Sequence, residues 1–265
     1  MARIIDAHAH IFPDKLARKA ADSIGHFYDI PMYTDAAVST LLTHESEAGV
    51  ALTLVCSSAV TPNQTESINN FIAAECASHP ELFGLAALHP DFAGFEEEIA
   101  RAISLGLHGF KFHSDFQKFY LDDDSAIPMF RAIAKTGLPV LLHAGDPRYD
   151  YSSPKAIANL MRKVPDLRVI AAHFGGYSRW DEVPCLPVCE NLRFDTSSSL
   201  FKLSTDDALR LIDHFGPEKF FFGTDFPMWS PKEELVRFRS LGLNAETEQM
   251  MLSENFEKFF GLNKQ

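Results

Sequence analysis

The stretch Ile4-Ile5-Asp6-Ala7-His8-Ala9-His10 combines a short apolar run with two histidines one residue apart. Side chains alternate between the two faces of a β-strand, so His8 and His10 lie on one face and can reach one metal ion near the end of the strand. Asp6 shares that face and is placed to orient one imidazole through a hydrogen bond. Pairs of this kind also occur without a metal, so the meaning of this one depends on the rest of the chain.

Similar apolar runs, rich in Val, Ile, Leu and Phe, recur along the chain and alternate with segments of helical period, a pattern typical of a parallel sheet. The runs are residues 4–9, 51–56, 83–88, 109–112, 139–142, 168–172, 192–195 and 220–223. Amphipathic segments between them are residues 36–48, 95–105, 127–135, 156–163 and 208–215. Residues 245–260 are predicted to form a last helix on the exterior.

Polar or ionisable residues close these runs at intervals of about thirty residues, with a longer gap after the first run, as in a βαβ repeat. They are His10, Ser57, His89, His113, His143, His173, Thr196 and Asp225. Eight such units can form an open doubly wound sheet or a closed barrel. In a barrel all strand ends converge on one rim, whereas an open sheet separates the first and last strands. We therefore predict an α/β single-domain (β/α)₈ TIM barrel over residues 1–265.

The long gap after the first run, residues 11–35, contains prolines and large aromatic rings. Such an insertion is equally compatible with a lid over the rim of the barrel and with a packed surface excursion.

Composition restricts the partners of the protein. The chain has 24 Lys and Arg residues against 36 Asp and Glu residues, a formal charge of −12, which opposes binding to nucleic acid or to an anionic membrane. No stretch reaches the roughly 18 to 20 apolar residues of a membrane span. We expect a cytoplasmic protein with a small-molecule substrate, and assembly into a homo-oligomer stays open.

The strand ends carry a set of metal-binding side chains. His143, His173 and Asp225 each follow an apolar run directly, as His8 and His10 do. Neutral imidazole and anionic carboxylate ligands suit Zn²⁺ best, with Mn²⁺ and Fe²⁺ also possible, and the number of donors allows one or two ions. The remaining histidines away from strand ends are expected to serve packing or surface roles. These are His26, His44, His79, His108 and His214.

The order of these residues, with Lys111 on the fourth run, resembles the amidohydrolase superfamily. The segments 5–10, His173-Phe174-Gly175-Gly176 and Gly223-Thr224-Asp225-Phe226-Pro227 are similar to its amidohydrolase-2 branch, which includes aminocarboxymuconate-semialdehyde decarboxylase-like enzymes. The resemblance implies a divalent metal held by His8, His10, His143 and Asp225, with His173 beside the water at the metal. Lys111 departs from the decarboxylases of the branch, and in binuclear members of the superfamily such a lysine is carboxylated and bridges two metals.

The residues themselves predict the chemistry. A Zn²⁺-like ion lowers the pKa of water and polarises a carbonyl group. Asp225 is then the expected proton acceptor and later donor, and His173 the group that positions water or stabilises an oxyanion. Lys111, His113 and Arg148 are candidate partners of an anionic substrate group, although Arg148 is equally compatible with a solvated loop. We favour an uncarboxylated Lys111 that meets substrate charge.

The leading hypothesis is metal-dependent hydrolysis of a small amide, ester or lactone. The alternative is non-oxidative decarboxylation by a carbon–carbon lyase, in which the metal binds the carboxylate and no water attacks. A catalytically silent metal-binding barrel is disfavoured, because the chain supplies both metal ligands and a candidate base.

Overall fold

The computed structural model describes residues 3–262, which fall into two compact units. Unit 1 comprises residues 3–56, 75–83 and 196–262, and unit 2 comprises residues 57–74 and 84–195. Unit 1 is thus assembled from both ends of the chain. Each unit has its own strands and its own cluster of polar side chains.

Unit 1 is built on the strand β1 (Ile5–His10), with parallel neighbours on both sides. On one side β2 (Leu52–Cys56) places Cys56 opposite His10, and β3 (Leu82–Gly84) follows β2 in the sheet. On the other side lie β9 (Phe220–Phe221) and the residues after it, where the amide of Ala7 donates to the carbonyl of Phe222 and Ala9 bridges Phe226. The first and last predicted strands are therefore neighbours, as a closed barrel requires.

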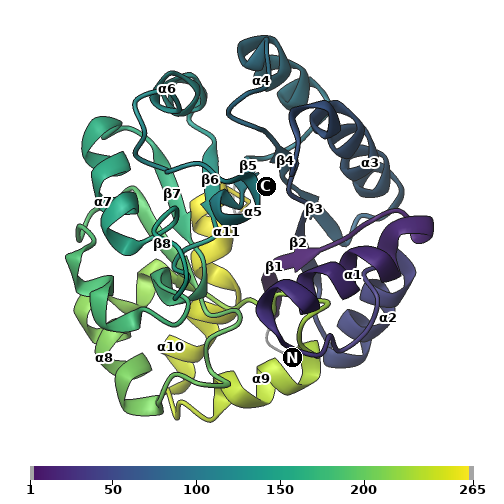
Figure 1. Ribbon diagram of the computed structural model, residues 1–265. Helices are drawn as coiled ribbons and strands as arrows, with labels where there is room; N and C mark the ends of the chain where they lie inside the picture. Colours follow the sequence, from purple (N-terminus) through teal and green to yellow (C-terminus); the bar gives the residue numbers. More distant parts are fainter. Residues whose placement is uncertain (1–2, 263–265) are drawn as a thin grey trace. The chain divides into compact units, whose positions relative to one another are not determined.

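Helices α1 (Asp14–Tyr28) and α2 (Val38–Ala48) lie beside β1 and β2 (Figure 1). The other helical segments of unit 1 are α8 (Thr205–Phe215), α9 (Pro231–Arg239), α10 (Ala245–Gln249), a π-helical turn (Met250–Glu254) and α11 (Asn255–Phe260). The ring of Phe221 on β9 contacts Phe256 and Phe259 on α11. Each buried ring removes 150–250 Å² from water, so this cluster stabilises the attachment of α11 by several kcal/mol, about 25 cal/mol per Å².

Unit 2 contains five parallel strands in chain order. They are β4 (Ala86–Ala87), β5 (Phe110–Phe112), β6 (Pro139–Leu142), β7 (Arg168–Ala171) and β8 (Leu192–Asp195). The helices are α4 (Phe95–Ser104), α5 (Ser114–Gln117), α6 (Ile127–Thr136) and α7 (Pro154–Lys163), and α7 lies outside β7 in Figure 1. Helix α3 (Thr65–Ser78) begins in unit 2 and ends in unit 1.

The strand predictions from the sequence are confirmed, with one refinement: the third run divides at the buried Leu85 into β3 and β4. Three helices begin at a serine cap, because the hydroxyls of Ser153, Ser204 and Ser230 each accept a backbone N–H from the first turn of α7, α8 and α9. The predicted last helix is interrupted by the π-turn, where the carbonyl of Met251 accepts the amide of Phe222.

The insertion after the first strand is largely helical. Helix α1 buries the small residues Ala17, Ala21 and Gly25, and the amide of Phe12 donates to the carbonyl of Ala36. These contacts describe a packed segment, and its role as a lid stays a prediction.

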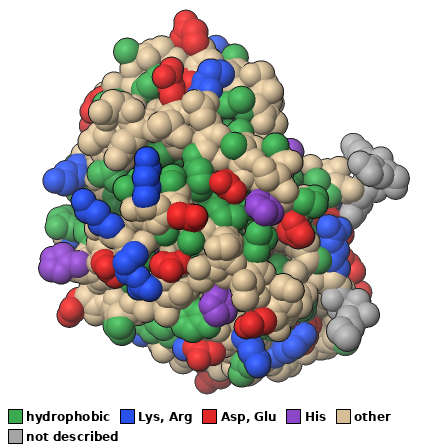
Figure 2. Space-filling model, turned by 90° about the vertical axis from the view of Figure 1, so that its right-hand side faces the viewer, with side chains coloured by type: hydrophobic (Ala, Val, Ile, Leu, Met, Phe, Trp, Pro, Cys, Tyr) green, Lys and Arg blue, Asp and Glu red, His purple; other side chains and the backbone are tan. Residues whose placement is uncertain are grey.

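No helix within residues 3–262 is both long and apolar enough to cross a membrane. On the face drawn in Figure 2, basic side chains are interspersed with acidic ones.

Candidate active site

Unit 1 brings three of the predicted metal ligands together. Asp225 Oδ1 lies 3.2 Å from His10 Nε2 and 3.6 Å from His8 Nε2. The backbone fixes this arrangement, since the amide of Asp225 donates to the carbonyl of His8 and the amide of His10 donates to the carbonyl of Phe226, both at 2.7 Å. Asp225 has a φ of +63°, a conformation that side-chain-bearing residues adopt rarely and that recurs at functional sites.

Asp6 holds the backbone around these ligands. Its Oδ1 accepts the amides of His8 and Thr224, and its Oδ2 accepts the Thr224 hydroxyl at 2.5 Å. Burial raises the pKa of Asp6 to about 6, and burial together with the charge of Asp6 raises the pKa of Glu45 well above its usual range. The orientation of an imidazole by Asp6 stays a prediction, and its two hydrogen bonds with Thr224 join β1 to the segment after β9.

The Nδ1 nitrogen of each imidazole has a neighbour other than Asp225. The hydroxyl of Ser197 lies 3.1 Å from His8 Nδ1, and the thiol of Cys56 lies 3.7 Å from His10 Nδ1. Both imidazoles thus turn Nε2 toward the carboxylate of Asp225, whereas Cys56 contacts His10 at Nδ1. Cys56 Sγ and one ring nitrogen from each of His8 and His10 also lie within 4.8 Å of one another, so Cys56 is a further candidate donor beside Asp225.

Unit 2 forms a second cluster at the ends of β5, β6 and β7. His143 Nδ1 lies 3.0 Å from His173 Nε2, and the ring of His113 stacks on that of His143 with centroids 4.0 Å apart. Asp115 Oδ2 accepts the Ser152 hydroxyl at 2.5 Å and lies 3.9 Å from His143 Nε2. Burial raises the pKa of Asp115 to about 7, and its Oδ1 is buried without a hydrogen-bond partner.

Backbone strain accompanies the second cluster. His173, Phe174 and Gly175 all have positive φ values, between 53° and 80°. The amide of His173 donates to Asp195 Oδ1 at 3.0 Å, and the indole of Trp180 donates to the carbonyl of His173 at 2.9 Å. These bonds hold the turn in a conformation that a free chain avoids.

The proposed substrate-binding residues differ in their surroundings. Lys111 is fully buried on β5, and His113 caps α5. Arg148 makes two hydrogen bonds from its guanidinium to the buried carboxylate of Asp146. Asp146 thus neutralises much of the charge of Arg148, whose role toward a substrate stays a prediction.

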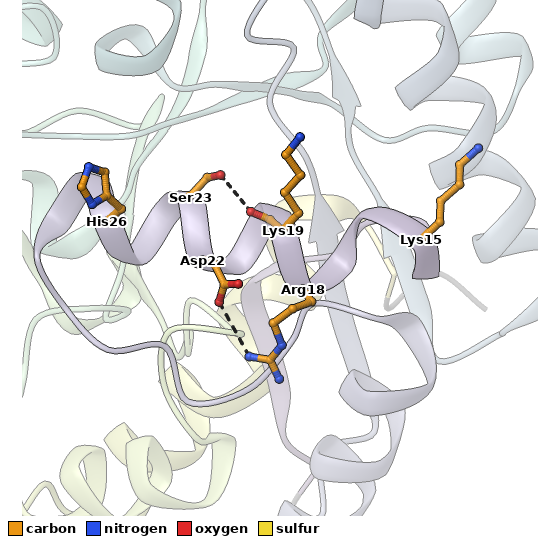
Figure 3. A pocket seen from close by; sticks show the side chains of 6 residues that line it. All are labelled: Lys15, Arg18, Lys19, Asp22, Ser23 and His26. Atoms are coloured by element: carbon orange, nitrogen blue, oxygen red, sulfur yellow. Dashed lines mark hydrogen bonds and ion pairs between the residues drawn. The ribbon is translucent and has the colours of Figure 1, made fainter.

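A surface depression of about 550 Å³ lies along α1, lined by Lys15, Arg18, Lys19, Asp22, Ser23 and His26 (Figure 3). Its lining contains none of the metal-ligand candidates. Arg18 pairs with Asp22 at 3.9 Å and Ser23 donates to the carbonyl of Lys19, so much of the lining is engaged within the helix itself.

Sequence reasoning missed Ser197 and Ser198, which lie beside His8 and Asp225. The signal was present, because Thr196 closes the seventh run and is followed by Ser197-Ser198-Ser199. Hydroxyl groups directly after a barrel strand are placed at the functional rim.

Comparison with solved structures defines the fold class. An uncharacterised TIM-barrel protein from Bordetella bronchiseptica has a TM-score of 0.80 at 17% identity, with 98% of each chain covered. A dihydroxybenzoic acid decarboxylase from Polaromonas sp. JS666, solved with manganese and the inhibitor 2-nitroresorcinol, has a TM-score of 0.79 at 17% identity, covering 100% of this chain and 98% of that one. A putative 2-pyrone-4,6-dicarboxylic acid hydrolase from Pseudomonas putida has a TM-score of 0.71 at 19% identity, with both chains fully covered. The fold is a (β/α)₈ TIM barrel, as predicted.

The family follows from the sequence match. A family model described as amidohydrolase matches residues 5–262, so the chain belongs to the amidohydrolase family. A search of curated proteins gave no match. The family and the His and Asp groups described above support a divalent metal, and the Polaromonas relative contains manganese rather than the zinc expected here.

Proposed function

We propose that the protein is a divalent-metal hydrolase of a small, anionic amide, ester or lactone, with the ion held by His8, His10 and Asp225. The observation that supports this is the convergence of two imidazole Nε2 atoms on one carboxylate oxygen, at 3.6 and 3.2 Å. Two neutral nitrogens and one anionic oxygen fit Zn²⁺, Mn²⁺ or Fe²⁺. The family resemblance adds His143 as a proposed fourth ligand.

When bound, a divalent cation acidifies water and polarises a substrate oxygen. Asp225 is the proposed base, because its Oδ1 faces the ligand nitrogens. There it can accept a proton from the attacking water and return that proton to the leaving group. His173 is proposed to donate to the oxygen that gains negative charge. Its Nε2 is within hydrogen-bond distance of His143 Nδ1, so one of these two nitrogens carries the proton that the other accepts.

The substrate is proposed to be a planar ring bearing a carboxylate. The Polaromonas and Pseudomonas relatives are named for ring carboxylic acids, dihydroxybenzoic acid and 2-pyrone-4,6-dicarboxylic acid. In this chain Lys111 and His113 are the proposed partners of the carboxylate, with Arg148 contributing less because Asp146 already pairs with it. We propose that Lys111 is uncarboxylated.

Decarboxylation is the second candidate, because the Polaromonas relative is a decarboxylase. The two reactions separate cleanly in H₂¹⁸O with a panel of ring lactones and ring carboxylic acids. Incorporation of ¹⁸O into the product indicates hydrolysis, whereas CO₂ release with an unlabelled product indicates a lyase. A protein that binds metal but converts no member of the panel contradicts both.

The metal assignment has its own test, independent of activity. We expect protein purified without chelator to retain one to two equivalents of a divalent transition metal, measured by elemental analysis. The double variant His8→Ala with His10→Ala should lose it while keeping the circular dichroism of the parent. His26→Ala is the matched control, because His26 lies on the exposed face of α1 and should leave metal content unchanged. A double variant that retains stoichiometric metal contradicts the assignment.

A further inference from the structure

The two oxygens of the Asp225 carboxylate have different neighbours. Oδ1 faces the imidazoles of His8 and His10, whereas Oδ2 accepts the hydroxyl of Ser198 at 2.5 Å. Both Asp225 and Ser198 are buried, so water does not replace this bond readily. The hydrogen bond from Ser198 therefore holds the carboxylate by Oδ2, the oxygen that does not face His8 and His10.

The direction of the Ser198 hydrogen bond is determined by its other neighbour. The indole Nε1 of Trp229 lies 2.9 Å from Ser198 Oγ, and an indole N–H can only donate. Ser198 Oγ thus accepts from Trp229 and keeps its single proton for an acceptor. The candidate acceptors are Asp225 Oδ2 and the thioether of Met228 at 3.4 Å, and the carboxylate is much the stronger of the two.

Trp229 is itself fixed in place. Its ring stacks on Phe201 with centroids 4.6 Å apart, and the guanidinium of Arg237 lies over it at 4.9 Å. Arg237 is paired in turn with the buried Glu234 on the same helix, α9. A row of contacts thus extends from α9 through Trp229 and Ser198 to the metal-ligand side chain.

The backbone of Ser198 is strained in a way that serves this contact. Its φ is +45°, a region where glycine is at ease and serine is not. Glycine would relieve the strain but would remove the hydroxyl. The chain therefore keeps an unfavourable backbone conformation together with a hydroxyl that donates to Asp225 Oδ2.

We propose that Ser198 and Trp229 are positioning residues for Asp225: they hold Oδ2 so that Oδ1 alone is presented to the cation and to the proton that Asp225 transfers. This inference rests on the proposed function, since it assumes that Asp225 is a ligand. Hydrogen-bonded neighbours of metal-ligating side chains typically account for about 10- to 100-fold in metal affinity.

The test is the dissociation constant for Zn²⁺ and for Mn²⁺, measured by competition with a chromophoric chelator on chelator-treated protein. Ser198→Ala and Ser198→Gly should both weaken binding by about 10- to 100-fold, because both lack the hydroxyl although only the second relieves the backbone. Trp229→Phe removes the N–H and keeps a smaller aromatic ring against Phe201, so a smaller loss of about 3- to 10-fold, the effect of one neutral hydrogen bond, is expected. Added to Ser198→Ala, it should cause no further loss, because the chain of hydrogen bonds is already broken.

Ser199→Ala is the matched control, since the Ser199 hydroxyl donates to the carbonyl of Ser197 and not to Asp225. It should bind both ions as the parent does. Unchanged metal affinity in both Ser198 variants, in folded protein and beside a parent that binds metal, overturns the positioning role and leaves the proposed function intact. A loss in Ser198→Ala that Ser198→Gly does not share overturns it too, since backbone strain would then be the cause. A parent that binds neither ion overturns both proposals.

Discussion

At the scale of single residues, Asp115 combines burial with an incomplete set of hydrogen bonds. One carboxylate oxygen accepts from Ser152 and the other is buried without a partner. Desolvation disfavours the charged form, which is why the pKa of Asp115 rises from 3.8 to about 7. The folded chain therefore retains a proton on this carboxyl over a pH range in which the unfolded chain has released it.

The sign of the resulting pH effect follows from that difference. Between about pH 4 and pH 7 the native state binds the extra proton, so rising pH removes stability. Relative to Asp115→Asn, which cannot ionise, we expect the parent to lose roughly 3 to 4 kcal/mol across this range. Urea denaturation of chelator-treated protein at four pH values measures it. Asp213→Asn, at an exposed position on α8, should follow the pH dependence of the parent. Parallel curves for the parent and Asp115→Asn would show that Asp115 ionises normally.

At the scale of elements, the loops after β6 and β7 lie very close to each other, and the glycine at position 145 allows this approach. Gly145 has a φ of +83°, and a Cβ there would lie 2.6 Å from the carbonyl carbon of Gly176. The amide of Tyr177 donates to the carbonyl of Ala144 at 2.6 Å, so the two loops meet backbone to backbone. These loops directly follow His143 and His173, and their close approach helps to set the distance between the two rings.

Alanine substitutions separate two reasons for a glycine at position 145, which are its positive φ and the close approach of the neighbouring loop. Gly106→Ala, at φ +81° with no atom within 4 Å, meets only the backbone penalty and should cost about 1 kcal/mol of unfolding free energy. Gly145→Ala adds a clash with backbone that cannot move cheaply, so we expect it to cost at least about 2 kcal/mol more. Urea denaturation of both variants at one pH makes the comparison. Equal losses would mean that the loops part without cost.

The elements themselves were largely predictable, and the contacts between them were not. Apolar runs and serine caps locate strands and helix starts because both depend on neighbours in sequence. The bond from Ser198 to Asp225 spans 27 positions and that from Ser152 to Asp115 spans 37. The positive φ of Ser198 likewise follows from tertiary contacts, since serine has no local preference for it. Reasoning from periodicity therefore identified His8, His10 and Asp225 but not the residues that hold them.

At the scale of the whole molecule, the family match and the charge of −12 favour a small-molecule partner over nucleic acid. A net negative charge repels polyanions rather than attracting them. For the small acid proposed above as substrate, we expect recognition to come from individual buried groups such as Lys111 and His113 rather than from the net charge. The substrate panel described above tests this expectation directly.

The neighbouring position of β1 and the segment after β9 also has a consequence for biosynthesis. Asp6 and Thr224, which share two hydrogen bonds, are 218 positions apart. At roughly 5 to 20 residues per second, a ribosome needs roughly 10 to 40 seconds to pass from one to the other. Throughout that interval β1 has an unpaired edge, and His8 and His10 have no carboxylate partner in Asp225. The proposed cation site is thus among the last features that a newly made chain can complete, and a nascent chain must protect its first strand until then.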